Sequence, residues 1–226
     1  MKNCEISINQ LAEFSDATQR RKTTLVEQQI VPNKVLLPWY QLAKAKIKKS
    51  IEQQGDLTPI NEGISQLLNQ QPDKDWKHHN KFISIEALQR FVSMKLPKVL
   101  QNVNYQIIKP EKKIFYIHGV AIKVAPEVIV NVNVNGRAII GAFKIHIKKK
   151  HFSKQQAELV ANILYRYLNE EVADKNEEVL PEYCFCLDVF SERIIHANKK
   201  DAENLETLKN LCVEIKEIWD SIQISQ

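Results

Sequence analysis

The sequence is poor in glycine, with five residues among 226. None of the five belongs to a G-x-G-x-x-G or G-x-x-x-x-G-K pattern, the loops in which exposed backbone N–H groups cradle phosphates. No H-E-x-x-H spacing is present either, so no histidine pair of the zinc-protease type is expected. These absences argue against nucleotide-triphosphate chemistry and against helix-borne zinc sites.

Cysteine is also scarce. The four residues are Cys4, Cys184, Cys186 and Cys212, and no two have the C-x2-C spacing of a zinc knuckle. Cys184 and Cys186 lie two apart in an apolar run, so both point to one face of a strand, where two thiolates would be able to share a metal. Small buried side chains are the preferred interpretation, because free cysteine packs as a hydrophobe.

Long apolar runs are missing as well. No segment approaches the roughly 18 uninterrupted apolar residues of a membrane span. The first residues lack the apolar region of a secretory signal, which favours reduced thiols and a cytoplasmic location. We therefore expect a soluble protein without membrane partners.

Charge is unevenly distributed along the chain. Residues 1 to 168 carry 26 Lys and Arg against 13 Asp and Glu, a net +13, whereas residues 169 to 226 carry 6 against 14, a net −8. Such asymmetry suggests contact with nucleic acid, although lysine also collects on helix faces that merely face water.

Apolar spacing predicts helices in the first hundred residues. Ser7 and Gln10 form a capping box before a short helix, followed by a basic linker to Lys22. Further helices are expected between Trp39 and Gly55, from a cap at Asn61 to residue 68, and from residue 76 to 94. A helix capped by Ser153 and a last helix over residues 199 to 222 complete the set.

Runs rich in β-branched residues predict strands over residues 105–108, 114–124, 128–134, 138–147, 183–190 and 193–196, with His118, His146 and His196 inside them. The fold class is therefore α+β, a mixed central β-sheet flanked by helices with an N-terminal helical region. We divide the chain into a helical region, residues 1 to 100, and an α/β core with a C-terminal helix, residues 101 to 226.

A β-hairpin is the clearest local signal. Asn135-Gly136 lies between two alternating runs, and a type I′ turn requires positive φ at both of its central residues. With a two-residue loop, paired residue numbers sum to 271, which places Glu127 opposite Lys144. One face of the hairpin is apolar and predicted to be core. The other mixes polar and small groups, including Ala142 and His146, and we expect a polar or ligand-like neighbour there, with His146 beside Lys144.

These residues resemble the PD-(D/E)XK nuclease superfamily: Pro126-Glu127 opens a strand, and Ala142-Phe143-Lys144 stands on the next. The resemblance covers about residues 84 to 197 and implies a restriction-endonuclease-like order α-β-β-β-α-β. It implies catalytic roles for Glu127 and Lys144, with Glu127 as a Mg²⁺ ligand. The hairpin is also similar to that of small bacterial proteins carrying the same degenerate pattern.

One position departs from that family. Ala142 stands where the resemblance implies a second carboxylate, and a single carboxylate seldom holds Mg²⁺. Glu86 on the preceding helix, or Asp188 on a later strand, is the candidate replacement. The alternative is a cross-strand ion pair between Glu127 and Lys144 with no chemistry, which would contribute about 0.2 to 1 kcal/mol to stability.

The densest basic patch follows the hairpin and consists of Lys148, Lys149, Lys150 and Lys154, next to His151. It suits nucleic-acid phosphates, or it is a solvated strand end. Two functions follow. The favoured one is a non-catalytic module, without cofactor, that binds nucleic acid or protein on a nuclease-like core, as a partner in a larger bacterial complex. The alternative is a Mg²⁺-dependent nuclease with a migrated or incomplete active site.

Overall fold

The computed structural model describes residues 3–31 and 39–224 and has the predicted α+β architecture. Its helices are α1 (Ile8–Ser15), α2 (Gln19–Ile30), α3 (Gln41–Glu52), α4 (Thr58–Leu68), α5 (Asp75–Ser93), α6 (Lys154–Glu171) and α7 (Asp201–Ile224), with a 3-10 turn at Lys98–Leu100. Its strands are β1 (Glu5–Ser7), β2 (Tyr105–Ile108), β3 (Ile114–Ile117), β4 (Val120–Lys123), β5 (Val128–Val134), β6 (Arg137–His146), β7 (Glu177–Asp188) and β8 (Arg193–His196).

Five strands form the main sheet in the order β2-β5-β6-β7-β8. All neighbours are antiparallel except β6 and β7, which run parallel because α6 carries the chain back across the sheet between them. The β5–β6 hairpin has the predicted register, from Val134 opposite Arg137 to Val128 opposite Phe143. Asn135 and Gly136 have φ of 52° and 81°, as the predicted turn requires.

A second sheet of three strands, β1-β4-β3, was not predicted. The sequence suggested one strand over residues 114–124, but the chain reverses at His118 and Gly119, both with positive φ, and forms the β3–β4 hairpin. His118 is therefore in a turn, and its expected place in a strand is wrong. The short β1 adds in parallel to β4, a pairing 116 positions apart at Glu5 and Ala121 that no local pattern signals.

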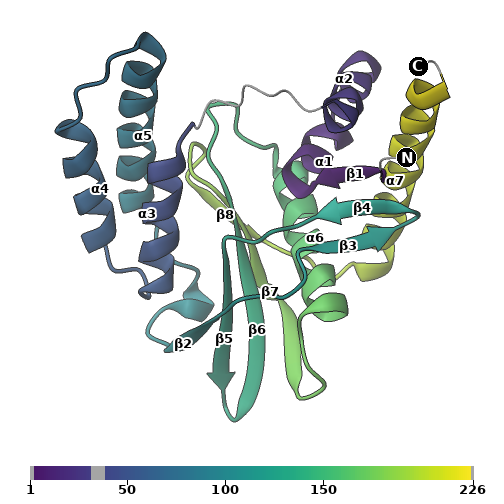
Figure 1. The fold of residues 1–226 in the computed structure, drawn as a ribbon. Helices are drawn as coiled ribbons and strands as arrows, with labels where there is room; N and C mark the ends of the chain where they lie inside the picture. Colours follow the sequence, from purple (N-terminus) through teal and green to yellow (C-terminus); the bar gives the residue numbers. More distant parts are fainter. Residues whose placement is uncertain (1–2, 32–38, 225–226) are drawn as a thin grey trace.

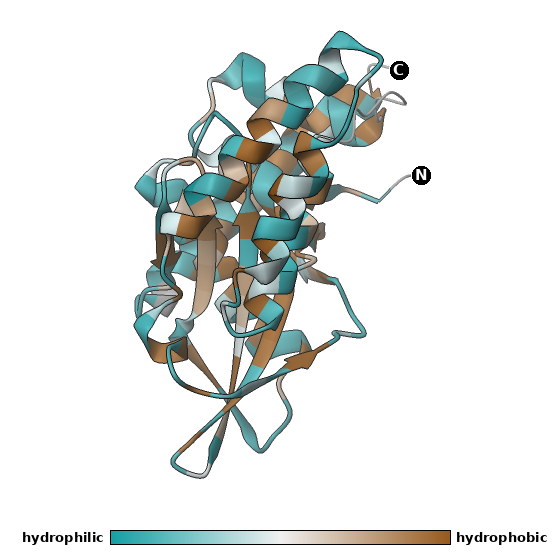
Figure 2. Ribbon diagram, turned by 90° about the vertical axis from the view of Figure 1, so that its left-hand side faces the viewer, coloured by the Kyte–Doolittle hydropathy of each residue, from teal (hydrophilic) through white to brown (hydrophobic). Residues whose placement is uncertain are grey.

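Helices cover both faces of the main sheet (Figure 1): α3, α4 and α5 form a layer on one side, while α6, α1 and α7 lie on the other with the small sheet. Each side has its own buried core. Val128, Val130 and Phe143 contribute to the first, and Ile129, Ile140 and Ala142 to the second. Figure 2 shows the matching pattern, with many hydrophobic residues in the strands and an alternation of hydrophilic and hydrophobic residues along the helices.

The two parts of the proposed division share both cores. Helices α1 and α2 pack with α6 and α7, whereas α3 to α5 pack on the opposite face of the sheet. The boundary at residue 100 stays a prediction. The early segment to Lys22 is not a linker, because α2 begins at Gln19 and is tied to its neighbours by ion pairs from Arg21 to Glu13 and from Lys22 to Glu214, each at 2.7 Å.

Helix starts follow the local sequence in two cases and not in a third. Ser7 and Ser153 cap α1 and α6, and Ser153 forms a complete capping box with Gln156. Asn61, predicted as a cap, lies inside α4, which begins three residues earlier at Thr58. There the Asp56 carboxylate accepts a hydrogen bond from the Thr58 N–H at 2.9 Å.

Strand β7 is longer than predicted because it contains an irregularity. Its pairing with β6 shifts between Ile140 and Ala142, and the skipped segment of β7 includes Pro181, which cannot donate to the ladder. Gly141 faces this segment, and a Cβ there would lie 2.5 Å from the carbonyl oxygen of Tyr183. The close backbone approach explains the glycine, and the irregular segment with Pro181 explains why the first half of the strand was not predicted.

Candidate functional site

Glu127 and Lys144 are cross-strand neighbours, as the register predicted. The Glu127 N–H donates to the Phe143 carbonyl at 2.9 Å, and the Lys144 Nζ lies 3.3 Å from Glu127 Oε1. Both side chains are largely buried, with 8% of the lysine and 11% of the glutamate side chain exposed. The pair therefore lies at the entry of β5, between the main sheet and the segment that leads from β4.

Lys144 is held by three acceptors. Besides Glu127, its Nζ donates to the carbonyls of Val124 at 3.0 Å and Ala125 at 2.7 Å. Ala125 has a positive φ of 39°, an uncommon conformation for a residue with a side chain. Burial lowers the pKa of Lys144, and the Glu127 carboxylate opposes that effect. The lysine is thus fixed by the backbone of the β4–β5 connection as much as by its carboxylate partner.

Glu127 has both oxygens engaged. Its Oε1 contacts Lys144 and, at 2.5 Å, the Nζ of Lys44, which extends from α3. Its Oε2 accepts a hydrogen bond from the Ile145 N–H at 2.7 Å. Two ammonium groups and one amide therefore surround a single carboxylate. Sequence reasoning missed Lys44, because only the tertiary packing brings α3 to this end of the hairpin.

The face of β6 that carries Ala142, Lys144 and His146 is covered by the protein itself. The expectation of a polar or ligand-like neighbour on this face is therefore wrong for most of the strand. Ile129, Ile140 and Ala142 are at most 1% exposed and pack in the same core as Ala157 and Ala161 of α6. The small residues of the hairpin accommodate the helix. Polar character is confined to the strand ends.

His146 and Asp188 occupy one of these ends, paired across the parallel strands β6 and β7. The His146 ring stacks on Phe152 with centroids 3.6 Å apart, and its Nε2 is 3.2 Å from the Lys150 carbonyl. Burial lowers the pKa of His146, whereas nearby Asp188 raises it. Asp188 is completely buried; its Oδ2 accepts from the Phe152 N–H at 2.7 Å, and its Oδ1 has no partner.

The other candidate acid has different partners. Glu86 on α5 forms ion pairs with Arg90 at 3.1 Å and with Lys149 at 3.8 Å. No group of three or more His, Cys, Asp or Glu residues is arranged to hold a metal among the described residues. As they stand, the side chains at Glu127 do not fit Mg²⁺, because both oxygens of the carboxylate have partners and Ala142 supplies none.

The cysteines are all free and buried. Cys184 and Cys186 share a strand face, as their spacing predicted, and burial raises the pKa of both thiols far above its usual range. Burial also raises the pKa of Cys4 to about 11 and that of Cys212 to about 12. Metal ligation requires the thiolate, so this environment disfavours the metal that two such cysteines would be able to share.

The predicted basic patch lies where β6 ends and α6 begins. Lys148, Lys149, Lys150 and Lys154 are exposed; Lys149 contacts Glu86, and Lys154 contacts Glu158 at 3.6 Å. Beside it is a cavity of about 120 Å³, lined by Glu13, Arg21, His146, Lys148, Lys150, His151, Phe152 and Gln156. Arg21 comes from α2, so the tertiary structure adds a cation that the sequence had assigned to a linker.

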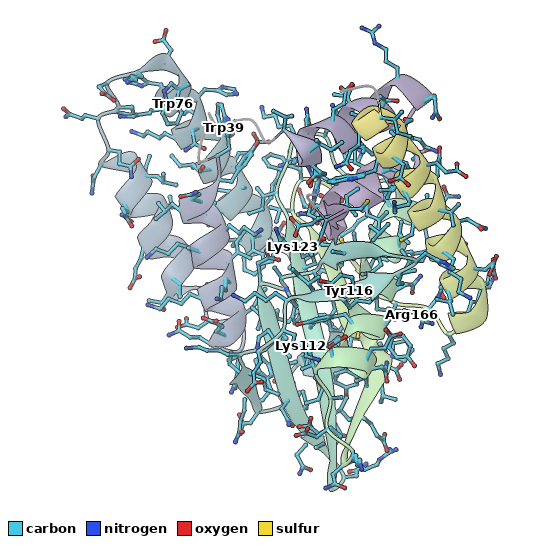
Figure 3. All side chains as sticks on the ribbon, turned by 45° about the vertical axis from the view of Figure 1, so that its right-hand side comes forward. Trp39, Trp76, Lys112, Tyr116, Lys123 and Arg166 are labelled. Carbon is cyan, nitrogen blue, oxygen red and sulfur yellow. The ribbon has the colours of Figure 1, made fainter. Side chains whose placement is uncertain are left out.

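Lysines are also exposed at the small sheet and in the segment before it. Figure 3 shows Lys112, Tyr116 and Lys123 along β3, β4 and the segment before them, well away from Trp39 and Trp76 in the α3–α5 layer. Lys112 and Lys123 pair with Glu171 and Glu5, each at 2.7 Å.

No helix in the described part of the chain is both long and apolar enough to cross a membrane. None of the protein-family models compared with the chain matches it, and a search of curated proteins found no similar sequence.

Proposed function

We propose that this protein is a non-catalytic nucleic-acid-binding module, in which the basic patch after β6 contacts phosphates and the Glu127–Lys144 pair serves stability. The observation that carries the proposal is the environment of Glu127. Its two oxygens bond to Lys44, Lys144 and the Ile145 amide. An ammonium group 2.5 Å from the carboxylate neutralises the charge that a divalent ion would need.

The arrangement of elements supports a nuclease-like core for this module. With the β3–β4 hairpin set aside, the chain passes through α5, β2, β5, β6, α6 and β7. That order favours the resemblance to PD-(D/E)XK proteins, and Ala142 in place of the second carboxylate favours a member without catalysis. The cytoplasmic location and the membership in a larger bacterial complex remain predictions that accompany this one.

Phosphate contact is the role that we assign to the basic patch. Lys148 and Lys150 are exposed and have no carboxylate partner in the described part of the chain, and both line the cavity that also receives Arg21. Cations without internal partners can neutralise phosphates and thereby release the counterions condensed on the nucleic acid, which is the main source of salt-dependent affinity.

The test is binding to fluorescent single- and double-stranded DNA and RNA, measured by anisotropy across a range of salt concentrations. We expect affinity to fall steeply with salt, and the double variant Lys148→Ala/Lys150→Ala to bind roughly tenfold more weakly with a salt slope smaller by about 2. The matched control is Lys112→Ala/Lys123→Ala, which removes two charges from the small sheet and should leave binding nearly unchanged. No binding to either polymer at low ionic strength, or equal losses in both variants, would contradict the proposal.

A metal-dependent nuclease is the second candidate, favoured by the shared location of Glu127 and Lys144 and by the partnerless Oδ1 of buried Asp188. Calorimetric titration of Mg²⁺ and Mn²⁺, together with cleavage assays on the same polymers, separates the two functions. We expect weak or absent metal binding. Metal-dependent cleavage that is abolished by both Glu127→Ala and Lys144→Ala would establish the nuclease instead.

A further inference from the structure

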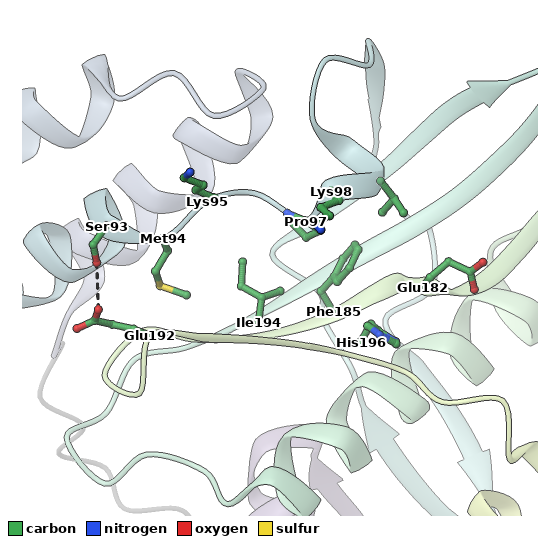
Figure 4. Close-up of a pocket in the computed structure, with 11 residues that line it drawn as sticks. Ser93, Met94, Lys95, Pro97, Lys98, Glu182, Phe185, Glu192, Ile194 and His196 are labelled. Carbon is green, nitrogen blue, oxygen red and sulfur yellow. Dashed lines mark hydrogen bonds between the residues drawn. The ribbon is translucent and has the colours of Figure 1, made fainter.

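A second cavity of the described structure lies at the β8 edge of the main sheet, and none of the basic-patch lysines lines it. It measures about 560 Å³ and lies between the segment that follows α5 and strands β7 and β8 (Figure 4). Its apolar lining consists of Met94, Pro97, Val99, Phe185 and Ile194. Ser93, Lys95, Lys98, Glu182, Glu192 and His196 surround this lining with polar groups.

Strand β8 forms the rim of this cavity and is the last strand of the sheet. The Val189 N–H donates to the His146 carbonyl on β6, whereas the Ala197 N–H donates to the Cys184 carbonyl on β7. Peptide groups alternate in direction along a strand, so those of Arg193 and Ile195 face β7. Those of Ile194 and His196 consequently point away from β7, on the side where β8 has no strand neighbour in the described part of the chain.

The same two residues, Ile194 and His196, have side chains that line the cavity. An extended segment laid against β8 would therefore exchange backbone hydrogen bonds with Ile194 and His196. Every second side chain of that segment would project to the cavity face, because side chains alternate with a period of two. The edge and the cavity together provide what a strand-addition site needs. Backbone hydrogen bonds along the edge give affinity, and the cavity selects the side chains that fit.

Charge on the opposite wall indicates the chemistry of the occupant. Lys95 and Lys98 are exposed at the cavity and have no carboxylate partner among the described residues. Glu192 is already engaged by Arg90 at 2.9 Å and by Ser93 at 3.1 Å, so it does not neutralise them. Glu182 of β7 also lines the cavity, so a ligand matches this site when it presents acidic side chains to Lys95 and Lys98 and apolar ones to the rest of the lining.

We propose that the β8 edge and its cavity bind an extended peptide segment of a partner protein, with apolar residues at alternating positions and acidic residues facing Lys95 and Lys98. The proposal concerns a site separate from the nucleic-acid surface and is independent of that function.

The experiment selects binders from a library of random ten-residue peptides displayed on phage, using the full chain as bait. We expect the enriched peptides to share alternating apolar positions and nearby acids, and to shift the amide signals of Ile194 and His196 in ¹H–¹⁵N spectra. A selection that enriches no peptide, or one whose peptides shift signals elsewhere, would overturn the proposal.

Two variants of one residue separate backbone from side-chain recognition. His196→Pro removes the outward N–H without removing a bond to β7, which is the position where an edge strand tolerates proline. His196→Ala removes the side chain and keeps the N–H. We expect the selected peptides to bind about tenfold more weakly to His196→Pro than to His196→Ala, because both variants lack the imidazole but only the proline variant also loses a ladder bond and leaves a carbonyl unpaired.

A further measurement keeps the test decisive if the proline variant does not fold. Two forms of each selected peptide are made, one with its odd-numbered and one with its even-numbered backbone nitrogens methylated. Only the form whose methyl groups replace the N–H groups facing β8 should lose binding to the wild-type chain. Equal binding of both methylated forms would exclude strand addition. Self-association of the wild-type chain that His196→Pro abolishes would assign the edge to a second copy and overturn the partner peptide.

Discussion

Single residues at the hairpin entry show how a pair that looks catalytic is used for stability in our proposal. Lys144 has three oxygen acceptors and Glu127 has three donors, so each charge is compensated inside the protein. Breaking a buried pair is more costly than never having formed it, because the remaining charge stays desolvated. The energetic role of the pair is therefore measurable without any assay of activity.

We predict that Glu127→Gln lowers the free energy of unfolding by roughly 3 kcal/mol, since Lys144 keeps its charge and loses its carboxylate. Lys144→Met should also destabilise the protein. The loss of unfolding free energy in the double variant should be smaller than the sum of the losses in the two single variants. Urea denaturation of the four proteins measures this coupling. The exposed pair offers a control, because Lys154→Met removes a lysine bound to Glu158 at the surface and should change stability by at most about 0.5 kcal/mol. Strictly additive losses for Glu127 and Lys144 would show that the two do not interact.

His146 gives a pH dependence of known sign. Burial lowers its pKa in the folded protein below the value of about 6.5 expected in the unfolded chain, so the unfolded state binds more protons in the window just below that value. Stability should therefore fall as the pH drops below 6.5. His146→Gln should flatten this part of the urea midpoint profile between pH 7.5 and 5. An unchanged profile for His146→Gln would contradict the assignment.

At the scale of elements, two glycines show which backbone requirements can be predicted from the sequence. Gly136 ends the predicted type I′ turn and has a positive φ with open space where a Cβ would point. Gly141 has no such signature, yet the backbone of β7 passes within 2.5 Å of its Cβ position. The first requirement is local and visible as Asn-Gly, and the second depends on a strand more than 40 residues away.

The two glycines should consequently respond differently to the same substitution. Gly136→Ala should lower the free energy of unfolding by about 1 kcal/mol, from the cost of a positive φ alone. Gly141→Ala should lower it by several times more, roughly 3 kcal/mol, because the contact is with backbone that cannot rotate away. Thermal or urea unfolding of both variants measures which substitution lowers the free energy of unfolding more. A larger effect for Gly136→Ala would mean that β7 adjusts freely around Gly141.

On the scale of the whole molecule, the charge asymmetry of the sequence is partly cancelled by folding. Acidic side chains of the last third pair with cations of the first two thirds: Glu214 with Lys22, Glu171 with Lys112, Glu178 with Arg137, and Glu192 with Arg90. Four of the cations behind the net +13 of residues 1 to 168 are thus paired with acids of residues 169 to 226. The cations that keep no carboxylate partner in the described structure, such as Lys148 and Lys150, are better candidates for phosphate contact than the sequence total suggested.

The sequence by itself determined the local features of this protein: the helix caps at Ser7 and Ser153, the Asn135-Gly136 turn, the register that follows from it, and thus the neighbourhood of Glu127 and Lys144. These depend on interactions between residues a few positions apart, or on a period of two that a tight turn transmits along both strands. Only the tertiary structure decided that Lys44 reaches Glu127, that Arg21 joins the basic cavity, that α6 covers the polar face of the hairpin, and that β1 pairs with β4. Those contacts join segments distant in the chain. They are stabilised by the apolar area buried on the two faces of one sheet, and no local sequence pattern predicts which distant segments bury that area together.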